Sequence, residues 1–343
     1  MKPTRATYVV AGSLLVCLGI ALVSLFVGSS GLTPQDAWRE WHAGLALRDA
    51  PALSILVEQR LPRTLAALLA GAGLALAGCS FQALLRNPLA TPYTLGVASS
   101  SALGAWSAFL MMDAHWVAGH VLGVPSVQLF AFLFAGVDVF LVYLVAVGKT
   151  RTAPSVLLLA GVTMGMLANS GILLTRYLAR PDRLVMMDRW IMGGVDVIGY
   201  SPMSTLLIGG IPCVLLLLAQ SAKFDQFSFG ADLAEGRGIN VRALQLITFL
   251  SASLLTAVIV SEVGPIGFVG LIVPHSVRAF TGARHRLLMP VCLPAGAAFL
   301  CFCDIVARAV MPGEIPVGII TTLIGGPFFI HLLIRRKFTD WES

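Results

Sequence analysis

Long apolar stretches alternate with short polar, glycine-rich or proline-rich segments along almost the whole chain. A helix needs about 20 mostly apolar residues to cross the hydrocarbon layer of a bilayer. Ten stretches approach that length: 7–29, 64–85, 92–112, 125–147, 154–176, 203–219, 243–261, 266–281, 287–308 and 316–334. Because every backbone amide in lipid must be satisfied within its own segment, each stretch is predicted to be a helix. The pattern therefore predicts an all-α integral membrane protein with about ten transmembrane helices.

The composition agrees with this fold class. Hydrophobic residues make up 57% of the chain and charged residues only 12%, whereas soluble globular domains carry about 25% charged residues. All six cysteines lie in apolar stretches, where cysteine behaves as a small hydrophobe, so neither disulfides nor a metal site is indicated. The net charge of +6 is spread over loops at both ends of the predicted helices. That distribution favours contact with anionic lipid over binding of nucleic acid.

Basic residues predict the orientation of the chain. The first apolar stretch follows Lys2 and Arg5 and resembles a signal peptide, but it is too long for the apolar core of one. If it is instead a helix that begins in the cytoplasm, ten spans return Arg335, Arg336 and Lys337 to the cytoplasm. Every lysine then lies inside, as the positive-inside rule requires. Several arginines are left outside, and they need a separate explanation.

One short segment resembles part of a nucleotide-binding loop. Gly148, Lys149 and Thr150 match the end of a phosphate-binding loop, but Tyr143 occupies the position of its first glycine. A transmembrane helix precedes the segment, whereas a phosphate-binding loop follows a strand. Nucleotide binding by this chain is therefore not predicted, and any ATP that drives it must be bound by another subunit.

Three segments rich in glycine, proline and arginine are not explained by hydropathy. The first runs from Arg-Leu-Pro-Arg at 60–63 to Asn-Pro-Leu-Ala at 87–90, and the others span 264–275 and 304–318. Snorkelling arginines and close helix packing are the structural alternative. Helix breakers at membrane depth, however, are tolerated only where protein or a water-filled cavity covers the backbone. Asn87 is therefore a candidate for a transport pathway.

Together these segments resemble the FecCD-type permease family. The resemblance rests on the sequences at 60–63 and 87–90, the 264–275 run and Glu-Ile-Pro-Val-Gly at 314–318, and it covers about residues 50–335 in the expected order. It implies one transmembrane permease domain, residues 1–343, in the inner membrane of the cell. That domain would be the membrane subunit of a type II ABC importer for an iron-siderophore, haem or cobalamin.

The resemblance also implies partners. These are a second permease copy, two cytoplasmic ATPase subunits and an external substrate-binding protein. ATP and Mg²⁺ would be held by the ATPase, and this chain would bind no cofactor. The outward arginines would meet acidic residues on the binding protein in charge-assisted pairs, which provide steering and register. The arginines that match the family in this role are Arg60, Arg63 and Arg308.

On the cytoplasmic side, the resemblance assigns contact with the ATPase to the segment 224–240. The residues expected to take part are Gly230, Asp232, Ala234, Glu235, Arg237 and Gly238. The chain departs from the family pattern at Ala231 and Arg237, so the individual contacts stay open. A cytoplasmic gate is expected from Asn87, Leu89 and Ser155, and a translocation pathway from Gly161, Gly165, Arg176 and Tyr177. Arg176 would attract an anionic chelate or contact the binding protein.

Two functions from other classes compete with this interpretation. A secondary transporter coupled to protons or sodium could use Glu262 and Asp304, since buried acids often mark proton relays. A membrane-embedded enzyme would need a nucleophile and a base in suitable positions, and no such pair is found. Within the importer family, iron-siderophore is the first expected cargo, followed by haem and cobalamin, with bare oxyanions such as molybdate still open. Pairing with a homologue instead of a second copy also stays open.

Overall fold

The computed structural model describes residues 5–28, 32–44, 47–111, 120–121, 124–147, 154–197, 199–311 and 313–335. The basic residues Lys2, Arg336 and Lys337, and the segment 148–151, lie outside this range. The helical elements are α1 (Arg5–Ser24), α2 (Pro34–His42), η1 (Leu47–Asp49), α3 (Pro51–Ser54), η2 (Ile55–Arg60), α4 (Leu61–Leu85), η3 (Pro92–Leu95), α5 (Val97–Leu110), α6 (Ser126–Val147), α7 (Pro154–Leu178), α8 (Pro181–Ile191), α9 (Ser201–Ala219), α10 (Ser221–Phe227), α11 (Ala231–Gly236), α12 (Val241–Val263), α13 (Val269–Thr281), α14 (His285–Val310) and α15 (Val317–Arg335). Two-residue strands, β1 (His120–Val121) and β2 (Val124–Pro125), pair antiparallel before α6. The all-α prediction is confirmed.

The predicted membrane spans recur as helices with altered boundaries. Seven helices of the described chain are long and apolar enough to cross a membrane, and the shorter helices α5, α13 and α15 complete the predicted ten. The span expected at 64–85 belongs to a continuous run of 35 residues from Pro51 to Leu85, which includes the π-helical turn η2. α5 begins only after Gly96, whose φ of 83° ends the 3₁₀ turn η3. Hydropathy located these spans, but it did not detect the amphipathic helices α2 and α8.

α4 is the central helix of the bundle. It is apolar around its circumference and largely buried, as expected of a helix surrounded by others. α9, α12, α13 and α14 pack around it. A Cβ on Gly71 would overlap the backbone of Gly296 in α14, and a Cβ on Gly78 would overlap Gly270 in α13. These two glycines therefore let α4 pack closely against α14 and α13, as small residues do between membrane helices.

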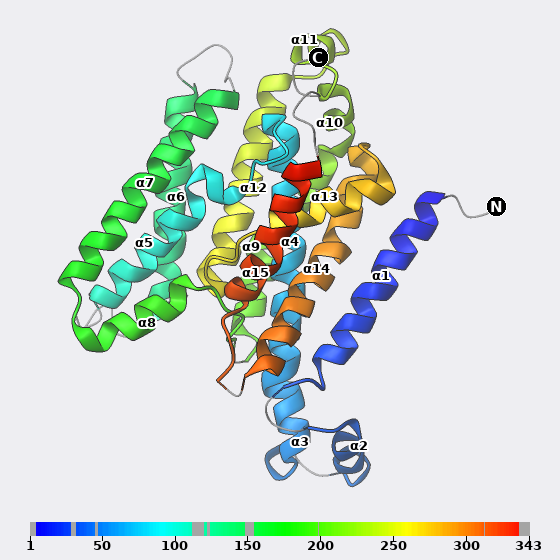
Figure 1. Ribbon diagram of the computed structural model, residues 1–343, viewed down its shortest axis with the longest axis vertical. Helices are drawn as coiled ribbons and strands as arrows, with labels where there is room; N and C mark the ends of the chain where they lie inside the picture. The colour runs from blue at the N-terminus through cyan, green and yellow to red at the C-terminus, as the bar shows by residue number, and fades with distance from the viewer. Residues whose placement is uncertain are drawn as a thin grey trace.

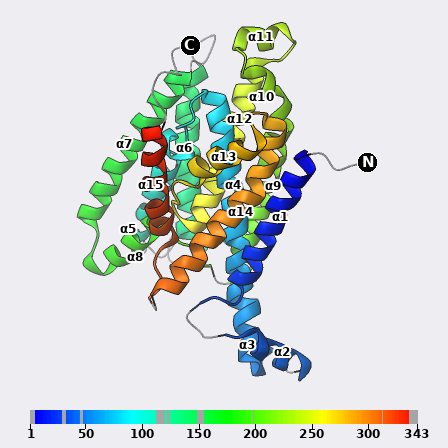
Figure 2. The ribbon, with the colours of Figure 1, turned by 45° about the vertical axis from the view of Figure 1, so that its right-hand side comes forward.

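The bundle has two distinct ends, and other helices flank the central helix α4 on two sides. α2 and α3 lie at one end, while α10 and α11 project from the other (Figure 1). α5, α6, α7 and α8 gather on one side of α4, and α1 packs on the opposite side (Figure 2). α1 exposes Leu14, Leu15 and Leu18, each more than half accessible, as expected where a helix faces lipid. These apolar helices make the chain an integral membrane protein.

Three breaks in the helices meet inside the bundle. They are the turn after α8, the link between α12 and α13, and the segment before α15. The backbone N–H of Gly194 donates to the carbonyl of Val263 (2.9 Å), and that of Gly318 donates to the carbonyl of Gly193 (3.0 Å). A Cβ on Gly318 would overlap the carbonyl of Met192. The non-helical backbone is thus covered by protein, as membrane depth requires, and the second and third glycine-rich segments of the sequence come together.

Candidate functional site

A cavity of about 500 Å³ lies where these broken segments face α5, α7 and α15. The residues that line it are Tyr93, Ala98, Ser99, Ala102, Asn169, Ile172, Ile191, Met192, Pro265, Gly267, Gly318, Ile319, Thr322 and Leu323. The lining is mostly apolar with a few neutral polar groups, and it contains no charged side chain. The hydroxyl of Tyr93 is buried and has no hydrogen-bond partner in the described part of the chain. Such a lining suits a large ligand that is held by shape and by a few hydrogen bonds.

The predicted gate residues lie at the α10–α11 end of the bundle. Asn87 follows the last turn of α4, and its side-chain oxygen accepts a hydrogen bond from the backbone N–H of Leu89 (2.9 Å). The backbone N–H of Ala90 donates to the carbonyl of Asn87 (3.1 Å), so residues 87–90 form one compact turn. Leu89 is 45% exposed, and Ser155 is exposed in the first turn of α7. The structure brings Asn87 and Leu89 together and places Ser155 on a separate helix.

The two glycines expected along the pathway pack inside the subunit. Gly161 and Gly165 are buried in α7, where they face Leu95 and Gly96 at the start of α5. This contact holds η3 and α5 against α7, so the packing explanation fits both glycines better than exposure to a pore. Asn169, on the same helix, lines the cavity instead.

The segment predicted to contact an ATPase is an ordered helical projection. α11 follows Gly230, which has a φ of 132°, and it ends in a Schellman motif. The backbone N–H of Ile239 donates to the carbonyl of Ala234 (3.0 Å) and that of Gly238, φ 81°, donates to the carbonyl of Glu235 (2.9 Å). Ala234 is buried under the projection, while Asp232, Glu235, Arg237 and Gly238 are exposed. The segment is therefore a capped helix with an exposed polar face, not an irregular loop.

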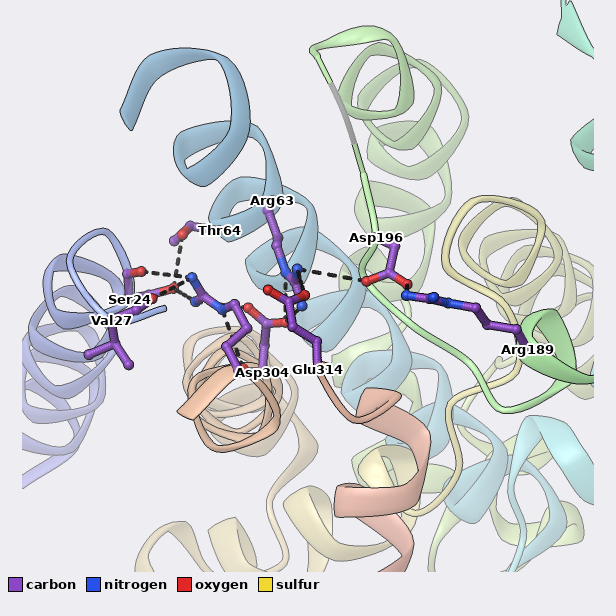
Figure 3. Close-up of polar contacts among 9 residues, drawn as sticks. Ser24, Val27, Arg63, Thr64, Arg189, Asp196, Asp304 and Glu314 are labelled. Carbon is purple, nitrogen blue, oxygen red and sulfur yellow. Dashed lines mark hydrogen bonds and ion pairs between the residues drawn. The ribbon is translucent and has the colours of Figure 1, made fainter. Parts of the chain in front are cut away.

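Arg63 is the centre of an ionic cluster at the α2–α3 end of the bundle (Figure 3). Its Nε and Nη2 donate to one carboxylate oxygen of Asp304 in α14 (3.0 and 2.9 Å), and its Nη1 donates to Glu314 (2.6 Å). Asp196, in the segment after α8, lies 3.7 Å from Nη1. The Arg63 side chain is 12% exposed, whereas Glu314 is 27% and Asp196 47% exposed. One guanidinium on α4 thus joins α14, the segment before α15 and the segment after α8.

The other two predicted docking arginines are buried. The Arg308 side chain is 3% exposed and pairs with Asp304 (2.9 Å). It also donates hydrogen bonds to the hydroxyl of Ser24 (2.7 Å) and to the carbonyls of Ser24 (3.2 Å) and Val27 (2.8 Å). Arg60 is 6% exposed and contacts the same segment after α1. In this conformation Arg60 and Arg308 fasten α1 to the bundle, and their surface offers little to a partner.

Four arginines in α7, in α8 and between these helices all have carboxylate partners. The pairs are Arg176 with Asp188, Arg180 and Arg183 with Asp182, and Arg189 with Asp196. Arg176 forms two bonds to Asp188 (2.7 and 3.1 Å) and its guanidinium lies 5.9 Å from the ring centre of Trp106. Tyr177, the next residue, is 86% exposed. The local positive charge is therefore largely compensated, and Arg176 ties α7 to α8.

Several residues of these sites were not found from the sequence. Asp196 stands in a segment without periodic pattern, and no motif or spacing singled out Arg86 or Asp225. Their partners lie far away in the sequence: Arg86 bonds to Phe227, and Asp225 bonds to the start of α14. Glu314 carried a signal, because it lies in the third glycine- and proline-rich segment. The sequence thus indicated the unusual segments, but which charged residues contact each other depends on the fold.

Comparison with known proteins gives a consistent result across the chain. The model of the FecCD transport family matches residues 14–335. The uncharacterised ABC transporter permease YvrB of Bacillus subtilis is 35% identical over 96% of this chain and 94% of its own length. The Fe(3+) dicitrate transport permease FecD of Escherichia coli is 35% identical over 94% of this chain and 97% of its own.

A vitamin B12 import permease and a solved structure add to these matches. The vitamin B12 import permease BtuC of Salmonella typhi is 33% identical over 94% of this chain and 93% of its own. A solved structure, assigned to the metal-chelate type of ABC transporter in an inward-facing conformation, superposes with a TM-score of 0.79 and 30% identity. It covers 96% of this chain and 100% of its own.

Proposed function

Since the chain belongs to the FecCD transport family and is thus an ABC transporter permease, we propose that it is the membrane-spanning subunit of an ATP-driven importer whose cargo is an iron(III)-siderophore. The observation that carries this proposal is the uncharged cavity of about 500 Å³ among broken helices. A bare ion held at membrane depth would need charged or coordinating groups around it. A large chelate brings its own ligands to the metal and needs only shape and a few hydrogen bonds.

The related proteins are named for two different cargoes. FecD is named for ferric dicitrate, and BtuC for vitamin B12. Both names denote metal chelates, so they do not decide between the two cargoes for this chain. Cobalamin, together with haem, is accordingly the alternative cargo, and the choice requires measurement with the binding protein.

The proposed orientation follows from the two ends of the bundle. The α10–α11 end faces the cytoplasm, where the exposed side chains of α11 contact an ATPase that binds ATP and Mg²⁺. The α2–α3 end faces a substrate-binding protein outside the inner membrane. The turn 87–90 and Ser155 then lie near the cytoplasmic end of the pathway, where a gate is required for alternating access. The cavity lies between these two ends, as broken-helix transporter sites do.

A second copy of the chain completes the proposed pathway. α7 exposes Leu159, Met166 and Leu173, each by more than 60%, but its exposed face also carries Thr163 and Ser170. Both hydroxyls donate to carbonyls within α7 (2.8 and 3.0 Å), and small hydroxyl residues are enriched where transmembrane helices pack on one another. This face of α7 is therefore the proposed contact with the second permease copy around a central pathway.

Arg63 is the proposed docking residue among the three arginines. Its partners Glu314 and Asp196 are 27% and 47% exposed, unlike the fully buried Asp304, so an acid on the binding protein can compete with them for the same guanidinium. Arg60 and Arg308 support it indirectly by fixing the end of α1. Charge pairs at the rim of an interface steer association, so Arg63→Ala should weaken docking more than Arg180→Ala, which changes an exposed arginine outside the cluster.

The proposal is tested by reconstitution of the chain with its neighbouring ATPase and binding-protein subunits in proteoliposomes. ATPase stimulation and uptake are measured with the binding protein loaded with a ferric siderophore, cobalamin or haem. Thr322→Trp, which places a large side chain in the cavity, should abolish uptake, while Leu14→Trp on the lipid-facing side of α1 should not. Uptake that persists without ATP but stops when the proton gradient collapses would support a secondary transporter and defeat the proposal.

A further inference from the structure

α10 is bonded to two transmembrane helices at the α10–α11 end of the bundle. The Nη2 of Arg86 donates to the carbonyl of Phe227 (2.7 Å), and the same guanidinium lies 4.3 Å from the centre of the Phe227 ring. On the other side, the carboxylate of Asp225 accepts hydrogen bonds from the backbone N–H groups of His285 and Arg286 at the start of α14. α10 is therefore held by the end of α4 and by the beginning of α14.

Arg86 has a backbone conformation that non-glycine residues rarely adopt. It ends α4 in the left-handed region, with φ 48° and ψ 35°, where a Cβ atom is sterically disfavoured. The next residue begins the compact turn, in which the backbone N–H of Asn87 donates to the carbonyl of Gln82 (3.2 Å) and its side chain accepts from Leu89. The backbone of Arg86 therefore leads directly into the compact turn of residues 87–90.

The carbonyl that binds Arg86 lies at the elbow between α10 and α11. It also accepts the backbone N–H of Gly230 (3.2 Å), the residue that redirects the chain into α11. The free carbonyls at the end of a helix attract cations, and the ring of Phe227 adds a cation–π contact. Beyond the elbow, Phe229 and Leu233 are 69% and 58% exposed, so the projection presents an apolar tip to a partner.

We propose that Arg86 is the positioning residue that couples the α10–α11 projection to the Asn87–Leu89 turn. This inference rests on the proposed function, in which the projection contacts the ATPase and the turn belongs to the gate. Displacement of α11 by the ATPase would be carried through Phe227 to Arg86 and from there to the turn. Asp225 holds α10 to α14, so α10 pivots about that contact instead of moving away as a whole.

The decisive variant is Arg86→Gly. Glycine adopts the left-handed conformation at no steric cost, so this change removes the side chain and preserves the end of α4. Arg242→Ala is the matched control, because Arg242 is an exposed arginine at the same end of the bundle, in the first turn of α12. Arg86→Lys keeps the charge but loses the planar guanidinium, which donates to the carbonyl of Phe227 and stacks on its ring. Its effect on the ATP response should lie between those of the native chain and Arg86→Gly.

In the full complex, the position of the turn is followed by thiol labelling of Leu89→Cys with a membrane-impermeant maleimide, with and without Mg-ATP. The chain that lacks this cysteine gives the background. We expect the labelling rate to change several-fold with ATP in the native and Arg242→Ala backgrounds and to be independent of ATP in Arg86→Gly. Uptake should fall at least tenfold in Arg86→Gly while basal ATP hydrolysis continues. An unchanged ATP response in Arg86→Gly would overturn the inference.

A second measurement does not depend on transport. Spin labels at Leu89→Cys and Leu233→Cys in the chain alone should give a narrow distance distribution, which broadens in Arg86→Gly but not in Arg242→Ala. Equal widths in all three backgrounds would overturn the link. If instead the native complex shows no ATP-dependent uptake, the proposed function fails, and the spin-label widths still decide whether Arg86 joins the two segments.

Discussion

The buried carboxylate of Asp304 allows a sharp test of what holds the α2–α3 end together. Asp304 is fully buried, and three guanidinium nitrogens approach it at 2.9–3.0 Å, two from Arg63 and one from Arg308. Asp304→Asn preserves the size of the side chain but removes its charge. Arg308, 3% exposed, would then be a buried cation without its carboxylate, and breaking a buried pair in this way costs about 3–5 kcal/mol.

Arg63 keeps its bond to Glu314, which places the expected loss for Asp304→Asn near the lower end of that range. The assay is equilibrium unfolding in mixed micelles of increasing SDS content, followed by tryptophan fluorescence. Asp182→Asn is the control, because Asp182 is 56% exposed and pairs with Arg180 at 3.3 Å. Exposed pairs contribute only about 0–1 kcal/mol.

A double-mutant cycle with Arg308→Gln isolates the pairwise part of the effect. Residues in direct contact show interaction energies of about 0.5–3 kcal/mol, whereas distant sites are additive within about 0.3–0.5 kcal/mol. Additivity of Asp304→Asn and Arg308→Gln, or a loss for Asp304→Asn no larger than that for Asp182→Asn, would refute the view that this cluster stabilises the fold.

Three further changes test other contacts of the structure. Gly78→Ala forces α4 and α13 apart and should lower the free energy of unfolding by about 1–3 kcal/mol. Gly136→Ala is the control, because open space surrounds Gly136, and it should not destabilise the fold. Equal unfolding curves for the two variants would contradict this packing. Asp225→Ala removes the acceptor of the first N–H groups of α14 and should cost about 0.5–2 kcal/mol. The loss should be visible as faster hydrogen exchange in the first turn of α14, and unaltered exchange would argue against the cap. Arg176→Ala should slow uptake without weakening docking, and unchanged uptake would remove Arg176 from the pathway. If Asp188→Ala slows uptake as much as Arg176→Ala, the effect comes from loss of the ion pair between the two residues and not from loss of attraction for an anionic chelate.

The outward arginines show how far sequence reasoning reached at the candidate site. The sequence identified Arg60, Arg63 and Arg308 as residues that the positive-inside rule does not explain. It could not tell that Arg308 is 3% exposed and Arg63 12% exposed, because burial depends on which helices surround an arginine. The same limit applies to Arg176 in α7 and to the three arginines that follow it, whose carboxylate partners lie in α8 and in the segment after it.

The hydropathy of the chain by itself determined an all-α membrane bundle, because a backbone in lipid satisfies its hydrogen bonds only in helices or closed barrels, and long continuous apolar stretches are typical of helices. The glycine- and proline-rich segments also showed where the helices are interrupted. Only the tertiary structure decided that these interruptions meet around one cavity and that Arg86 reaches Phe227 across 141 positions of the sequence. The reason is physical: helix formation in lipid depends on local composition, whereas a cavity or an ion pair depends on the packing of distant segments.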